Sequence, residues 1–257
     1  RQAVPQTGKN GMKKSTNKSI KVLLVGACMI MAASCDSKSS APPATAAAAA
    51  PVETGPAVPP AQMRTVEVTE AKASEGKALF AERCVACHAE AGAGRIGIGP
   101  RLNSTSFLAA ASDAMLRRTI TFGRVGTTMI PWGAAMKPEQ IDAVIAYMRA
   151  WQKVEPATLN EAPLKGTVAG GEKVYIDICV SCHGQTGAGY QETANGTGIG
   201  RKAFLDAATN GYLRHVIKEG KSQTKMRPFD KGSPVSVANL SDQEIEDVIV
   251  YLRNRAW

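Results

Sequence analysis

Apolar residues recur at helical spacing near the end of each half of the chain. The two sets are Ile141, Val144, Ile145 and Met148, and Ile245, Val248, Ile249 and Leu252. Residues spaced three and four apart line one face of a helix, so each set predicts an amphipathic helix. Pro138 suits the first turn of one helix, and the capping box Ser241-x-x-Glu244 starts the other. No strand-like alternation of any length occurs, and we therefore predict an all-α fold.

The features before these helices also occur twice and in the same order. Each half has a glycine eight residues and an aromatic residue four residues before its first cysteine. A Gly-Ala-Gly loop and a middle helix that reads Leu-Arg-x-x-Ile-x-x-Gly follow. Cys84 and Cys179 mark the two copies, 95 residues apart. This repeat predicts two tandem domains of one fold, over residues 73–153 and 170–257, joined by a linker over 154–169.

Each copy contains one C-x-x-C-H pentapeptide. The two are Cys84-Val85-Ala86-Cys87-His88 and Cys179-Val180-Ser181-Cys182-His183. This pattern is the attachment signature of c-type haem: two thiols hold the porphyrin and the histidine is the proximal iron ligand. The alternative is structural zinc, but zinc ribbons pair two C-x-x-C units in one site, whereas each unit here heads its own repeat. We therefore expect two covalently bound haem c groups.

The sixth ligand of each iron has few candidates. The chain has three histidines, and two of them, His88 and His183, are the expected proximal ligands, so the haems cannot both have two histidine ligands. Met129 and Met226 each stand six residues after the glycine that ends the middle helix, in a Met-x-Pro-aromatic pattern. We predict these two methionines as iron ligands, with Met136 as the alternative for the first haem.

Two other residues of these types are expected to have no role at the iron. Met148 lies on the predicted C-terminal helix, where the other copy has Leu252, so it is assigned to the core. His215 aligns with Arg118 of the first copy and is therefore expected on a helix surface.

The net charge of +9 belongs mainly to the first residues of the chain. Six of the 31 basic residues precede Ser34, where no acidic residue occurs, which leaves 25 basic and 22 acidic residues in the remainder. Nucleic acid is therefore not expected as a partner. Residues 1–34 are typical of a secretory leader that begins at Met12, and the residues upstream of Met12 are not expected to be native.

The leader ends in Ala32-Ala33-Ser34-Cys35, which resembles the lipobox of bacterial lipoproteins. The resemblance implies a lipid on Cys35 and a protein anchored on the periplasmic side of a bacterial membrane. The alternative is cleavage by ordinary signal peptidase, which would leave a soluble periplasmic protein. Residues 35–72 are rich in alanine and proline, and we predict a tether there.

Both copies resemble class I c-type cytochromes, over roughly residues 73–152 and 170–257. The shared features are the helix before C-x-x-C-H, the glycine-rich loop, the middle helix, the methionine loop and the C-terminal helix. In that family the first and last helices cross. The resemblance therefore implies that Phe80 lies near Tyr147 and Tyr175 near Tyr251.

The family also has a Gly-Pro loop whose carbonyl bonds the ring of the proximal histidine. Gly99-Pro100 matches this loop, so the resemblance assigns Pro100 to the haem site. We align the Gly-Ile-Gly of residues 198–200 with that of residues 97–99, which gives the second copy about six extra residues. Gly200-Arg201 then takes the place of Gly-Pro, and the resemblance does not supply the bond in the second copy.

An iron with histidine and methionine ligands has no open position for a substrate, and its potential is raised. This predicts an electron carrier rather than an enzyme, with a redox donor and acceptor such as a membrane oxidase, reductase or dehydrogenase. One alternative is a dihaem enzyme, peroxidase-like or thiosulfate-oxidising, which needs an iron with an open distal side. The other is a fixed electron-relay subunit of a membrane respiratory complex.

Basic residues gather near both methionine loops. They form either a basic rim for an acidic partner or an ordinary solvated face. The residues are Arg117, Arg118, Arg124, Lys218, Lys221, Lys225, Arg227 and Lys231.

Overall fold

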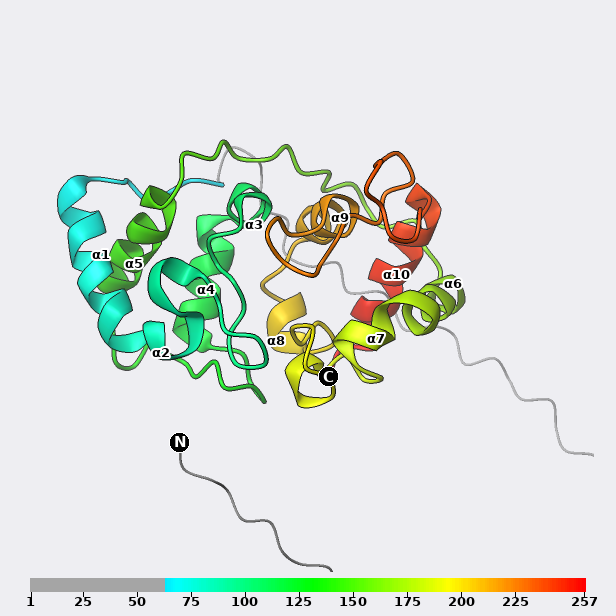
Figure 1. Ribbon diagram of the computed structural model, residues 1–257, viewed down its shortest axis with the longest axis horizontal. Coiled ribbons are helices and arrows are strands. Elements are labelled where there is room, and N and C mark those ends of the chain that lie inside the picture. Colours follow the sequence, from blue (N-terminus) through cyan, green and yellow to red (C-terminus); the bar gives the residue numbers. More distant parts are fainter. Residues whose placement is uncertain (1–62) are drawn as a thin grey trace, which may run out of the picture. The chain divides into compact units, whose positions relative to one another are not determined.

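The computed structural model describes residues 63–257, and these fold as two similar sets of helices (Figure 1). The first set comprises α1 (Glu70–Arg83), α2 (Val85–His88), α3 (Thr105–Ala110), α4 (Asp113–Phe122) and α5 (Pro138–Ala150). The second comprises α6 (Val168–Val174), a π-helical turn η3 (Tyr175–Cys179), α7 (Val180–His183), α8 (Lys202–Leu205), α9 (Asn210–Glu219) and α10 (Asp242–Asn254). The described residues contain isolated β-bridges but no strand, which confirms the all-α prediction.

The first and last helices of each set pack directly on each other, α1 on α5 and α6 on α10 (Figure 1). Glycine allows this close contact, because a Cβ at Gly76 would lie 1.9 Å from the carbonyl oxygen of Ala143. A Cβ at Gly171 would lie 2.0 Å from the carbonyl oxygen of Asp247. The glycine eight residues before each first cysteine is therefore the crossing point of two helices.

Aromatic pairs lie beside both crossings. The rings of Phe80 and Tyr147 have centroids 5.6 Å apart, and those of Tyr175 and Tyr251 are 5.4 Å apart. Both pairs are those expected from the resemblance to class I cytochromes, and both are confirmed. Phe80 on α1 and Tyr175 on η3 each lie four residues before the first cysteine of a C-x-x-C-H motif.

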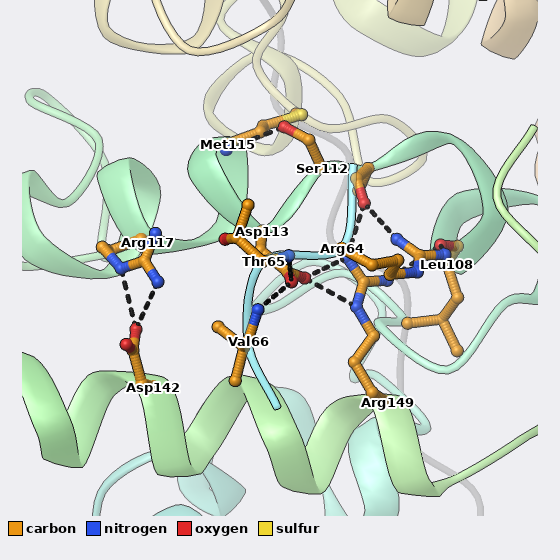
Figure 2. A network of polar contacts seen from close by, with 11 residues as sticks. Arg64, Thr65, Val66, Leu108, Ser112, Asp113, Met115, Arg117, Asp142 and Arg149 are labelled. Carbon is orange, nitrogen blue, oxygen red and sulfur yellow. Dashed lines mark hydrogen bonds and ion pairs between the residues drawn. The ribbon is translucent and has the colours of Figure 1, made fainter. Parts of the chain in front are cut away.

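An arginine on the C-terminal helix of each domain binds backbone carbonyls that precede the middle helix. Arg149 donates to the carbonyls of Leu108 (2.8 Å) and Ala111 (2.6 Å) and pairs with the fully buried Asp113 at 2.7 Å (Figure 2). In the second domain, Arg253 occupies the corresponding place and donates to the carbonyl of Leu205 at the end of α8 and to that of Ala208 (2.6 Å), three residues further on. The C-terminal helix therefore binds the end of the helix that precedes the middle helix.

The chain before α1 is part of the first domain. Met63 and Val66 are buried, and the Asp113 carboxylate accepts the backbone N–H groups of Thr65 (2.7 Å) and Val66 (2.9 Å) (Figure 2). The prediction that the tether extends to residue 72 is therefore wrong from residue 63 onwards. The sequence analysis missed this packing because the segment has few apolar residues. Two buried side chains and a buried carboxylate are enough to bind it. The rest of the predicted tether, Cys35 and the leader lie outside the described residues.

The predicted linker is also packed along part of its length. Leu159 is buried, and the Glu161 carboxylate accepts the N–H of Gly211 at 2.9 Å. Arg214 on α9 donates to the carbonyl of Asn160 at 2.6 Å. Residues 159–161 therefore lie against the second domain, and α6 begins after Thr167, whose side chain caps it.

Candidate functional site

The two C-x-x-C-H motifs form short helical turns that follow directly from the first helix of each domain. In both, the first cysteine precedes the turn and the second cysteine and the histidine lie within it, on α2 and α7. None of the four motif cysteines is in a disulfide, and all are partly exposed. Burial raises the pKa of Cys84 to about 11 and that of Cys179 to about 12, so before haem attachment both side chains are protonated at neutral pH.

Each motif histidine is oriented by a backbone carbonyl. His88 Nδ1 lies 3.0 Å from the oxygen of Pro100, and His183 Nδ1 lies 2.8 Å from that of Thr197. A carbonyl only accepts, so Nδ1 is the protonated nitrogen and Nε2 keeps its lone pair. Burial lowers the pKa of both histidines and favours the neutral ring. A neutral imidazole with a free Nε2 is what an iron ligand requires.

The Thr197 bond corrects the alignment of the two copies. A Cβ at Gly99 would lie 2.4 Å from Cys87 O, and one at Gly196 would lie 2.4 Å from Cys182 O. Gly196-Thr197 is therefore the counterpart of Gly99-Pro100, and the alignment of residues 198–200 with 97–99 was wrong. The Gly-Ile-Gly match gave the wrong alignment because the hydrogen bond to the histidine ring needs only a backbone carbonyl, which any residue supplies. The second domain has this histidine bond without the proline.

The methionine loops of the two domains have the same backbone hydrogen bonds. The Arg124 N–H donates to Met129 O at 2.8 Å, and the Lys221 N–H donates to Met226 O at 2.7 Å. The loops turn at Gly123 and Gly220, which have φ of +64° and +69°. A Cβ there would also meet the backbone of the loop at 2.5 Å, so glycine is required at both turns.

A threonine inside each loop holds the methionine amide. Thr127 Oγ1 accepts the N–H of Met129 at 3.1 Å and donates to Arg124 O at 2.8 Å. Thr224 does the same with Met226 (3.1 Å) and Lys221 (2.7 Å). The sequence analysis missed these threonines, although Thr-x-Met in both copies was a visible signal.

The Thr127→Val substitution removes both bonds and keeps the shape of the side chain. We expect the free energy of unfolding of the first domain to fall by about 1 kcal/mol, because the part-buried Met129 amide loses its partner and the Arg124 carbonyl keeps only the backbone N–H of Thr127. Denaturant titration followed by haem absorption measures this change. The Thr128→Val variant is the control, since Thr128 is exposed. Equal unfolding midpoints for the two variants would contradict the role of Thr127.

The methionines differ in their surroundings. Met129 and Met226 are partly exposed at the ends of their loops, whereas Met136 and Met148 are only 4% and 3% exposed and belong to the apolar core. Met148 is thus a core residue, as predicted, and the burial of Met136 favours Met129 as the ligand. Arg124 also lies close enough to His88 to lower its pKa, after the larger effect of burial.

The donor groups suit haem better than zinc. Among residues 63–257, no group of three or more His, Cys, Asp or Glu side chains is arranged to hold a metal ion. Each domain instead offers two cysteines outside any disulfide, one neutral imidazole and one methionine loop. His215, the third histidine, lies half-buried on α9.

Two family models match the chain, one for each domain. Residues 71–148 match "Cytochrome C oxidase, cbb3-type, subunit III", and residues 168–256 match "Cytochrome c". The chain contains two c-type cytochrome domains. It therefore carries two covalently bound haem c groups with iron.

Curated relatives include subunits of one type of oxidase. "Cbb3-type cytochrome c oxidase subunit FixP" of Bradyrhizobium diazoefficiens is 30% identical over 58% of this chain and 52% of its own length. Subunit CcoP of Rubrivivax gelatinosus is 28% identical over 69% of this chain and 52% of its own length. The chain thus spans about half the length of these relatives. Among residues 63–257, no helix has the length and apolar character needed to cross a membrane.

A solved structure also overlaps with much of the chain. It belongs to the Kuenenia stuttgartiensis reducing HAO-like protein complex, with 23% identity, 74% of this chain covered, 98% of that chain covered and a TM-score of 0.44. A TM-score at this level supports no conclusion about function.

Most of the basic residues near the methionine loops have partners within the protein. Arg117 pairs with Asp142 at 2.7 Å, Arg118 with Asp206 at 3.9 Å, and Lys218 with Asp242. Lys225 donates to Asn195 at 2.7 Å, while Arg124 and Lys221 stack on phenylalanine rings. Arg118 and Lys225 are exposed all the same. Arg227 and Lys231 remain exposed.

Proposed function

We propose that this protein transfers electrons between redox partners through two c-type haems, each with one histidine and one methionine ligand. His88 with Met129 and His183 with Met226 would hold the irons, and the four motif cysteines would hold the porphyrins. The bound haem supplies an iron that exchanges single electrons between its ferric and ferrous states. The observation that carries the proposal is the methionine loop, which has the same hydrogen bonds in both domains.

The contributions of the protein to this chemistry follow from its own groups. The carbonyls of Pro100 and Thr197 fix the ring orientation of the proximal histidines and raise their basicity as ligands. The threonines of the methionine loops hold the backbone amide of each methionine. If histidine and methionine hold each iron, no position would be left for a substrate, which supports an electron carrier over a peroxidase-like or thiosulfate-oxidising enzyme.

The relatives favour one kind of partner. Because the curated relatives are named as subunits of cbb3-type cytochrome c oxidases, we propose that this chain works as an electron relay to a membrane oxidase of that type. A lipid on Cys35 would hold the two domains at the periplasmic side of the membrane. This anchor rests on the sequence alone, since Cys35 lies outside the described residues.

Electron exchange with membranes tests the proposal. The full chain, reduced with ascorbate, is mixed in air with solubilised membranes of the producing bacterium, and haem absorption is followed. We expect both haems to be oxidised at a rate proportional to the amount of membrane. A protein that stays reduced, or that turns over hydrogen peroxide by itself, would contradict the proposal. Co-purification with an oxidase in mild detergent separates a fixed subunit from a free carrier.

A further inference from the structure

The methionine loop of the second domain, residues 220–226, is bonded to helix α3 of the first domain. Both domains belong to one compact unit of the chain. The Ser106 hydroxyl accepts the N–H of Ser222 at 2.8 Å and donates to the carbonyl of Gly220 at 3.1 Å. Ser106 thus binds the backbone on both sides of Lys221.

Further contacts join the same two segments. The hydroxyls of Ser104 and Thr105 lie 3.0 and 2.7 Å from that of Ser222. The Nζ of Lys221 lies 4.4 Å from the ring centroid of Phe107 on α3, within cation–π range. The loop therefore finds partners for its backbone and its cation on the other domain.

Gly220 and Ser222, which Ser106 binds, flank Lys221, and Lys221 makes the hydrogen bonds that position Met226. The Lys221 N–H closes the loop on Met226 O at 2.7 Å, and Lys221 O accepts from Thr224, whose hydroxyl holds the Met226 amide. A displacement of Gly220 and Ser222 would move Lys221 and both of these bonds. The position of Met226 is thus coupled to Ser106.

The first domain does not receive the same support. Its loop also places a cation on the other domain, with the Arg124 guanidinium 4.7 Å from the ring of Phe204. However, Ala203 stands where the first domain has Ser106, and Val125 stands where the second has Ser222, with 79% of its surface exposed. The side-chain amide of Gln191 donates a hydrogen bond to Gly126 O, at 2.7 Å, at the exposed tip of this loop. The hydroxyl contacts between α3 and the loop of the second domain therefore have no counterpart at the loop of the first domain.

We propose that the first domain positions the methionine loop of the second, with Ser106 as the positioning residue, so that the hold of Met226 on its iron depends on helix α3. The inference rests on the proposed role of Met226 as a ligand. A loop that is fixed on both sides of Lys221 resists displacement of its thioether by an external ligand. When these bonds are lost, the external ligand displaces the thioether more easily.

Competition with imidazole measures this hold in the full-length holoprotein. In a Met129→His background, the weak long-wavelength band of ferric iron bonded to a thioether reports on Met226 alone. Adding Ser106→Ala is expected to raise the affinity for imidazole on the order of tenfold, because two hydrogen bonds are lost. Ser106→Thr keeps a hydroxyl and is expected to restore most of the resistance.

The reverse background separates positioning from a general loss of stability. With Met226→His, the band reports on Met129, which belongs to the same domain as Ser106. We expect Ser106→Ala to leave the imidazole affinity there unchanged. An unchanged affinity at Met226, or an equal rise at both sites, would overturn the inference and leave the proposed function standing. A missing band in the Met129→His background itself would overturn both.

Discussion

Replacing Met129 or Met226 with alanine is expected to lower the midpoint potential of the affected haem by on the order of 0.2 V, a fraction of the roughly 0.8 V that axial ligands span. A thioether stabilises ferrous iron relative to ferric iron, and water or hydroxide in its place does not. Because each domain has its own methionine loop, each substitution is expected to move one of the two one-electron steps. A spectroelectrochemical titration of the full chain measures both potentials.

Met136→Ala is the matched control for Met129→Ala. It removes the same side chain from the same domain, but from the apolar core. We expect it to reduce the stability of the first domain, since Met-to-Ala changes in cores cost about 2–5 kcal/mol. Its potential should stay close to that of the unaltered protein. If Met136→Ala lowered the potential and Met129→Ala did not, the sixth ligand of the first haem would be Met136.

Gly76→Ala is expected to lower the free energy of unfolding of the first domain by about 3 kcal/mol, the upper end of the usual cost of overpacking. The added methyl group would lie 1.9 Å from the carbonyl oxygen of Ala143. Backbone atoms do not move aside as a flexible side chain does, so α1 and α5 must separate. Denaturant unfolding followed by haem absorption measures the loss.

The control for Gly76→Ala is Ser74→Ala, on the exposed face of the same helix. This change adds no contact and favours the helix slightly, because alanine has the higher helix propensity. If both variants unfolded at the same denaturant concentration, the crossing of α1 and α5 would not depend on glycine. Gly171→Ala is expected to have the same effect on α6 and α10 in the second domain.

Helix positions and their contacts could be predicted from the repeat. Apolar spacing located α5 and α10, and the resemblance to class I cytochromes paired Phe80 with Tyr147 and Tyr175 with Tyr251. These features depend on side chains, whose type and spacing are written in the sequence. The family models then matched each copy as a cytochrome domain.

Backbone groups account for what the sequence did not reveal. The carbonyl that orients His183 belongs to Thr197, a residue with no special side-chain chemistry. The segment at residues 63–66 binds through its N–H groups to Asp113, which no composition argument would find. Contacts between the domains, such as Ser106 with Gly220, join residues 114 positions apart and have no local pattern.

Carbon monoxide binding to the reduced protein tests the central claim, that both irons are saturated by ligands from this chain. Carbon monoxide binds ferrous haem that has an open or weakly occupied sixth position. With Met129 and Met226 on the two irons, we predict that saturating carbon monoxide leaves the reduced visible spectrum of the full chain unchanged at neutral pH. A spectral change in either haem would show an accessible iron. It would contradict the account of this protein as an electron carrier with two closed sites.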